Sequence, residues 1–229
     1  MDIEVSPRKL LAWLLIIIAL LLIANIFAIL SKLVFHLGPI YGLVPLFEFD
    51  REENIPTLFS TLQLLAASFL LVFIGSSCKS RGEAFIFWFV LALVFFFLAI
   101  DETAQIHELT GAPIRAKLNL TGLLYFGWIV PYGLATLILG LLSLPFLSRL
   151  PEQTRWLFVT SGIVYVAGAV GIEMLGGNYI AKGGTYDFVF SVYATCEETL
   201  EMLGVALFVY ALAAYISSEF RFLRFTIQD

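Results

Sequence analysis

Charge is scarce in this sequence of 229 residues, because only 14% of them are charged while 60% are hydrophobic. An ordinary soluble domain is about 25% charged and about 45–50% apolar, and a soluble fold could not bury such an apolar excess. A basic excess is missing as well, since the net charge is -5, and this excludes a nucleic-acid-binding protein. The two cysteines are too few for a disulfide scaffold. These absences leave an integral membrane protein, with the lipid bilayer as its surroundings and no nucleic acid as a partner.

What the sequence does contain is long apolar runs. A transmembrane helix needs about 20 mostly apolar residues, and six stretches meet this requirement. No series of short alternating strands is present, so we predict an all-α fold, a polytopic helical membrane bundle that forms a single domain over residues 1–229. The first run is too long for a signal peptide. The predicted spans cover residues 10–34, 57–76, 84–108, 123–147, 156–175 and 188–217.

The distribution of basic residues predicts the orientation. The two termini and the loops on their side hold 8 of the 13 Lys and Arg residues, and the opposite side holds 5. Because basic loops stay in the cytoplasm, we expect both termini to be cytoplasmic. Of the acids, 6 lie on the side of the termini and 12 on the outer side. The negative balance of the chain is therefore predicted to be external, where it attracts cations.

Acidic residues converge on one predicted level of the bundle. With a rise of about 1.5 Å per residue, Asp101, Glu102 and Glu173 lie about 25 Å above the cytoplasmic starts of their spans. Glu197 and Glu198 lie at the outer start of the last span, with Glu201 one turn deeper. If the third span continues past residue 100, Asp101, Gln105 and Glu108 share one face of it. Acids at membrane depth are costly, and such residues mark functional sites.

A divalent cation is the cofactor that these residues predict. Carboxylate oxygens suit Ca, Mg or Mn, and the nearby imidazole of His107 also allows Zn or Fe, with His36 as a second imidazole at the end of the first span. The sequence has only two histidines and no Glu-x-x-His pair, which excludes a three-histidine zinc site and the di-iron pattern of helical bundles. We expect His107 or Glu198 to act as the general base. The predicted ligands are Asp101, Glu102, His107, Glu108, Glu173, Glu197 and Glu201.

Structural explanations for the same acids stay open. Arg51, Arg115, Lys117 and Lys182 could neutralise them in a salt-bridge network, and protonated acids could form a proton pathway. Glu197 and Glu198 also suit the start of a helix, where the dipole favours negative charge.

The segment 37–56 before the second span is predicted to be a lid. Its prolines and glycines break regular structure, and its apolar residues suggest a stretch that lies on the outer interface or over the bundle. Asp50, Glu52 and Glu53 form either a solvated turn or acids that complete the cluster from above. Asn54 and Pro56 are predicted to cap the second span and begin its first turn.

Two further expectations concern helix packing. Ala167 and Gly171 are spaced as a small-xxx-small contact, which would let a neighbouring helix approach Glu173. Pro131 is expected to kink the fourth span.

Three segments carry a family resemblance. FDREENIPTLFSTLQLL, IDETAQIHE and EETLEMLG resemble an uncharacterised family of bacterial multi-pass inner-membrane proteins. The resemblance implies a bacterial inner (plasma) membrane as the location, and it implies no activity, cofactor or partner.

Three functions are compatible with these observations. The first is a metal-dependent enzyme that acts on a lipid or another lipid-soluble substrate. The second is a cation-coupled transporter or channel, for which the spans are poor in polar residues below the acidic level. The third is an accessory subunit, in an oligomer or a larger membrane complex, whose acids pair with the bases of a partner.

Overall fold

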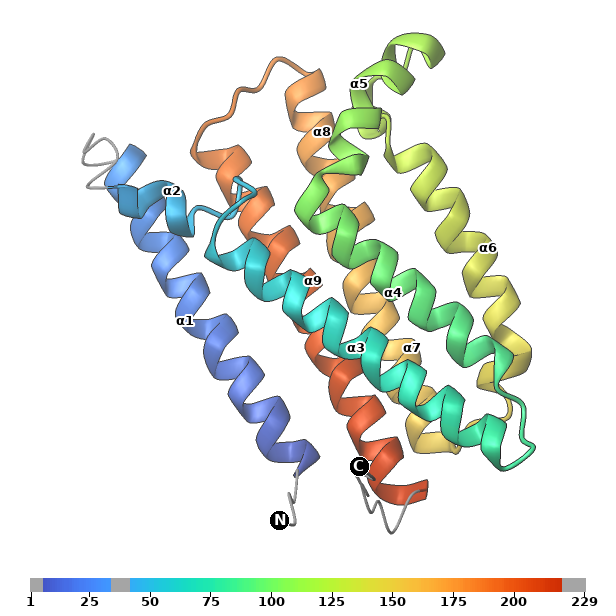
Figure 1. The fold of residues 1–229 in the computed structure, drawn as a ribbon. Coiled ribbons are helices and arrows are strands. Elements are labelled where there is room, and N and C mark those ends of the chain that lie inside the picture. Colours follow the sequence, from blue (N-terminus) through green and yellow to red (C-terminus); the bar gives the residue numbers. More distant parts are fainter. Residues whose placement is uncertain (1–5, 34–41, 220–229) are drawn as a thin grey trace.

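The chain forms a bundle of long helices (Figure 1). The computed structural model describes residues 6–33 and 42–219, and this part of the chain contains helices and turns but no strand. The helices are α1 (Pro7–Leu33), α2 (Leu43–Phe47), α3 (Ile55–Ser80), α4 (Ile86–Ala104), α5 (Ile106–Leu118), η2 (Gly122–Leu124), α6 (Ile129–Leu147), α7 (Glu152–Val166), η3 (Ala167–Ile172), α8 (Glu173–Ala181) and α9 (Phe188–Glu219).

Within residues 6–33 and 42–219, six helices are long and apolar enough to cross a membrane, which confirms the predicted multi-pass helical bundle. Five of them are α1, α3, α4, α6 and α9. The sixth is a continuous helix over residues 152–181 that is built from α7, η3 and α8. The start of α1 and the end of α9 lie at the same end of the bundle (Figure 1). We call the other end, where α4 ends and α3 begins, the acidic end.

The core lies where α3, α4 and α9 meet. Leu64, Leu71 and Ile74 follow the spacing of one helix face on α3, and all three side chains are buried. They pack in the same cluster as Trp88 of α4 and Leu212 of α9. α6, by contrast, has Ile129 as its only buried residue and lies at the edge of the bundle (Figure 1). One side of the bundle is therefore tightly packed, and the side that faces α6 is not.

The third predicted span does not continue to residue 108 as one helix. It ends at Ala104, because Gln105 adopts the left-handed conformation with φ 54°, and α5 begins at Ile106. The expectation that Asp101, Gln105 and Glu108 share one continuous helical face is therefore wrong. The fourth span begins at Ile129 and not at residue 123. Pro131 consequently falls in the first turn of α6, where its missing N–H breaks no hydrogen bond, so the physical reason for the expected kink does not apply.

A π-helical segment, η3, interrupts the fifth span just before Glu173. Its wider turns shift which residues face α9, so the close contact falls on Gly168 and not on the predicted Ala167 and Gly171. A Cβ atom at Gly168 would lie 2.7 Å from the backbone oxygen of Glu197, whereas one at Gly171 would meet nothing within 4 Å. π-Helical turns occur frequently at functional sites, and this one brings the backbones of η3 and α9 together beside Glu173 and Glu197.

Candidate functional site

A large cavity lies between α6 and the helices α4, α7 and α9. Its volume is about 1700 Å³, and it is lined by side chains of α4, α6, α7 and α9. Most of the lining is apolar, with Phe146 and Phe158 among the residues toward the end that holds the termini. The acidic end of the cavity is lined instead by carboxylates and by His107. The candidate site is thus the polar end of an apolar cavity.

The cavity is lined by all seven predicted ligands and by Glu198, the other predicted catalytic residue. Asp101 and Glu102 come from α4, His107 and Glu108 from α5, Glu173 from the start of α8, and the remaining three from α9. The loop before α3 adds Asp50 and Glu52 to the same lining. Nine carboxylates and one imidazole therefore line the cavity, and the described lining residues include no Lys or Arg. The carboxylates belong to Asp50, Glu52, Asp101, Glu102, Glu108, Glu173, Glu197, Glu198 and Glu201.

The break at Gln105 orients His107. By turning the chain there, it places the backbone N–H of His107 3.0 Å from Asp101 Oδ1 and the ring Nδ1 3.0 Å from Asp101 Oδ2. A carboxylate can only accept, so Nδ1 carries the proton and donates it, which leaves Nε2 directed away from Asp101. The Tyr132 hydroxyl donates to Asp101 Oδ1 at 2.8 Å. Such a carboxylate behind a histidine fixes the ring orientation in metal sites.

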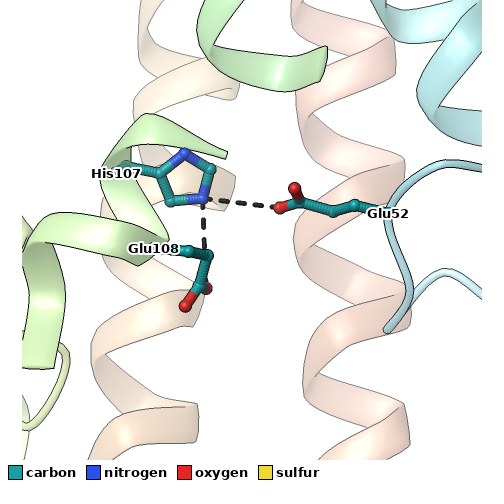
Figure 2. Close-up of side chains that lie close together, drawn as sticks. All are labelled: Glu52, His107 and Glu108. Carbon is teal, nitrogen blue, oxygen red and sulfur yellow. Dashed lines mark ion pairs between the residues drawn. The ribbon is translucent and has the colours of Figure 1, made fainter. Parts of the chain in front are cut away.

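Two carboxylates lie close to the other ring nitrogen of this imidazole (Figure 2). His107 Nε2 lies 3.6 Å from Glu52 Oε1 and 4.0 Å from Glu108 Oε1. One potential ligand atom from each residue lies within 4.8 Å of the other two. Two ligands of one ion are separated by about 3–4 Å, since each bond to the metal is about 2.0–2.2 Å long. Glu52, His107 and Glu108 can therefore hold a metal ion together after small side-chain movements.

Burial and the surrounding charges shift the pKa values of the side chains in this part of the site. Burial alone would lower the pKa of His107, but the hydrogen bond and charge of Asp101, with the charges of Glu52 and Glu108, raise it to about 9. Burial raises the pKa of Glu52 to about 7, and the charge of His107 opposes this shift. Burial and the charge of Glu48 raise the pKa of Asp50 to about 6. The group therefore binds positive charge favourably. Protons compete with a metal ion for the same side chains.

The loop that carries Glu52 is held firmly in place. Asn54 caps α3 as predicted, because its Oδ1 accepts from the Thr57 N–H at 3.0 Å, and its Nδ2 donates to the backbone oxygen of Glu48 at 2.8 Å. Asn25 of α1 accepts from the Phe49 N–H at 2.9 Å. Glu52 Oε2 is buried and has no hydrogen-bond partner among the described residues. A buried, unpartnered carboxylate oxygen beside an imidazole is suited to a cation.

Glu52 was not among the predicted ligands. In the sequence, Asp50, Glu52 and Glu53 are explained most simply as a solvated turn, and only their position directly before the second span indicated that they could complete the acidic cluster from above. Of the predicted lid, residues 37–41 lie outside the described part of the chain, as does His36. The described part, α2 with the loop after it, packs along α1 and brings Phe49, Asp50 and Glu52 to the acidic end of the cavity.

The remaining acids lie deeper along α4, α8 and α9. Glu173 is buried, accepts from Trp128 Nε1 at 3.2 Å and is an electrostatic neighbour of Glu197. Glu102, Glu198 and Glu201 are electrostatic neighbours of one another. A second group of carboxylates thus lies next to Glu52, His107 and Glu108. Among the described residues, no Lys or Arg nitrogen lies within 4 Å of these deeper carboxylates.

The basic residues that might have neutralised the cavity are engaged elsewhere or do not line it. Arg51 pairs with Glu48 at 3.0 Å, outside the cavity lining. The guanidinium of Arg115 lies over the ring of Tyr125, 4.2 Å from its centroid. Lys117 and Lys182 are exposed and are not part of the lining. The salt-bridge network that the sequence left open is therefore absent from the described part of the cavity.

Comparison with known proteins gives a family without a described activity. No curated protein and no solved structure matches the chain. The family model described as "Domain of unknown function (DUF8692)" matches residues 13–215, which is most of the sequence. This agrees with the resemblance to an uncharacterised family, and the chain belongs to the DUF8692 family of unknown function.

Proposed function

We propose that this protein binds a divalent cation at the acidic end of its cavity and uses it to act on a lipid or another lipid-soluble substrate. The observation that carries the proposal is the convergence of Glu52, Glu108 and the free Nε2 of His107 beside an apolar cavity. With both of its oxygens engaged by His107 and Tyr132, Asp101 orients the imidazole, in place of the ligand role that the sequence suggested.

The donor set narrows the choice of metal. Two carboxylates and one imidazole suit Mn²⁺, Fe²⁺ or Zn²⁺ better than Ca²⁺ or Mg²⁺, which prefer oxygen donors alone. Three protein ligands leave coordination positions for water or substrate, as in catalytic metal sites. The bound cation would polarise the substrate or activate a water molecule.

The deeper carboxylates supply the base. Glu198 lines the cavity beside Glu102 and Glu201, and a carboxylate that is not bound to the metal can accept the proton that an activated water loses. This gives Glu198 the role of general base, while His107 remains a ligand. By the distribution of bases, the site would face the outer leaflet of a bacterial plasma membrane.

Metal binding can be measured directly on the purified protein. We expect one Mn²⁺ per chain, with nitrogen coupling from one imidazole in pulsed electron paramagnetic resonance. His107→Gln should remove this coupling and weaken binding at least about 100-fold, whereas His36→Gln should preserve the coupling. Glu52→Gln should weaken binding similarly. Glu53→Gln, which makes the same change at the next, exposed position, is the matched control.

The opposite results would end the metal proposal. A protein that takes up no stoichiometric Mn²⁺, Fe²⁺ or Zn²⁺ contradicts it. So does equal weakening by Glu52→Gln and Glu53→Gln, because that result reports general charge and not a site.

Catalysis needs its own experiment. The metal-loaded protein is incubated with a bacterial polar-lipid extract, and the products are compared by mass spectrometry with those of the His107→Gln variant. A lipid converted only by the unsubstituted protein supports an enzyme. Unchanged lipids together with metal flux into liposomes would indicate the transporter instead.

A further inference from the structure

The cavity extends far beyond Glu52, His107 and Glu108. Its volume of about 1700 Å³ exceeds the roughly 300–1,000 Å³ of pockets that hold drug-sized ligands. Its walls are built from membrane-spanning helices, and its apolar lining continues from Tyr132 near the acidic end to Phe146 and Leu147 at the far end of α6. An elongated apolar molecule therefore fits the cavity better than a compact one.

The same walls are open to the bilayer. Leu142 of α6, Ile163 of α7 and Leu93 of α4 all line the cavity, yet each is more than 60% exposed at the surface of the bundle. These residues lie inside spans, where the surrounding medium is lipid chains. The cavity is thus continuous with the bilayer interior, and a hydrocarbon chain can enter between the helices from the side.

The charge at the acidic end selects the head group. Nine carboxylates line the cavity and its described lining contains no Lys or Arg, although bases are the usual partners of a phosphate. After a divalent cation has been bound by Glu52, Glu108 and His107, the carboxylates of Glu102, Glu173 and the α9 acids remain without a counter-charge. An anionic head group would be repelled there, whereas an ammonium group would donate hydrogen bonds to several carboxylates.

We propose that the cavity binds a long-chain amine, whose hydrocarbon chain lies between α6 and the helices α4, α7 and α9 and whose ammonium group meets the carboxylates of Glu173, Glu197 and Glu201. This names the substrate class of the proposed enzyme and rests on that function for its catalytic meaning. The binding itself requires only the cavity and its acids.

Three probes with one chain length test the head group. Octadecylamine, octadecanol and octadecyl phosphate are added to the protein in phosphatidylcholine nanodiscs, with empty nanodiscs as the background, both with EDTA and with Mn²⁺. We expect saturable binding with octadecylamine at least about tenfold tighter than octadecanol, and octadecyl phosphate weakest. Equal binding of the amine and the alcohol would overturn the head-group assignment, and so would a preference for the phosphate in Mn²⁺.

Two pairs of variants locate the binding. Thr136→Trp fills the cavity from α6 and should abolish binding of all three probes, whereas Leu137→Trp, at a neighbouring position that is 60% exposed and does not line the cavity, should leave it unchanged. Glu197→Gln with Glu201→Gln should lower amine binding to the level of the alcohol. Binding that survives Thr136→Trp, or an amine preference that survives the double substitution, would overturn the proposed location.

The head-group test does not depend on any variant, because the ratio of amine to alcohol binding is measured on the unsubstituted protein. It therefore gives a result even if a variant fails to fold. This readout is also separate from the metal proposal. Loss of the amine preference in a protein that binds Mn²⁺ rejects this inference only. A preference for the amine in a protein that takes up no metal rejects the enzyme proposal and leaves the binding site standing.

Discussion

Two glutamates four residues apart show opposite ways of burying a carboxylate at the acidic end. Glu48 is 2% exposed and lies between Lys32 and Arg51, which pair with its two oxygens. Glu52 faces the imidazole of His107, and its second oxygen is buried without a partner among the described residues. This difference indicates which carboxylate is structural. Two basic side chains of the protein neutralise Glu48, whereas Glu52 has only the imidazole of His107 beside it and can bind an external cation.

The largest expected effect sets these two residues against each other in the metal-free protein. Glu48→Gln leaves the charges of Lys32 and Arg51 without their partner and should lower the free energy of unfolding by about 2 kcal/mol, since both bases are partly exposed. Glu52→Gln removes a carboxylate that has only the titratable imidazole of His107 as a basic neighbour and whose pKa burial raises to about 7, so it should change stability by less than Glu48→Gln. Reversible unfolding in mixed detergent with EDTA measures both. If Glu52→Gln were the more destabilising, Glu52 would be structural.

The second prediction uses pH. The folded state raises the pKa of His107 from 6.5 to about 9, so the stability gained from the protonated imidazole is present below pH 6.5 and lost as the pH rises through 9. Glu52, raised from 4.5 to about 7, likewise binds its proton more tightly in the folded state. The metal-free protein should therefore lose stability from about pH 5 to pH 9, and His107 alone should account for a loss of about 2 kcal/mol between pH 7 and 9.

The same measurement has an internal control. His107→Gln should flatten the pH dependence above pH 7, whereas Glu48→Gln should shift the whole curve downward and keep its slope there. A protein whose stability rises over this range, or whose slope survives His107→Gln, would contradict the assigned environment of the imidazole.

The fold could be predicted from the sequence to a large extent, because hydrophobic length alone decides whether a helix can span a bilayer. The rise per residue along each span predicted that Asp101, Glu173 and Glu197 lie at one level of the bundle, and the structure adds that all three line one cavity. What could not be predicted was local backbone geometry. The left-handed Gln105 turns His107 back onto Asp101, and nothing in the composition of that segment indicates this.

The sequence did not predict which charges pair either. In the sequence, Arg51 stands next to Glu52 and could have neutralised it, but the structure pairs it with Glu48. The π-helical turns of η3 similarly moved the close contact from Gly171 to Gly168. The first outcome depends on the turn that the loop makes between Glu48 and Arg51, which are three residues apart, and the second depends on a change in helical period. The spacing of residues along one regular helix contains neither.

The third prediction concerns the residue behind the histidine. Asp101→Asn keeps the shape but weakens the hydrogen bond to Nδ1–H and removes the negative charge that supports the ring, so metal affinity should fall about tenfold. Tyr132→Phe, which removes only the hydroxyl that donates to Asp101, should have a smaller effect. Mn²⁺ titrations that follow the nitrogen coupling measure both. A loss of affinity as complete as that of His107→Gln would make Asp101 a ligand itself.

The smallest expected effect tests whether Glu48 stays neutralised after it loses one of its two basic partners. Arg51 is 55% exposed in its side chain, and Glu48 keeps Lys32 when Arg51 is lost, so Arg51→Met should lower the free energy of unfolding by less than about 1 kcal/mol. It also removes a positive charge next to Glu52, which should leave Mn²⁺ affinity unchanged or raise it slightly. Unfolding and Mn²⁺ titration of the same preparation report both quantities. If Arg51→Met weakened metal binding as strongly as Glu52→Gln, the two glutamates would form one electrostatic unit, and Glu48 would serve the site by positioning the loop that carries Glu52.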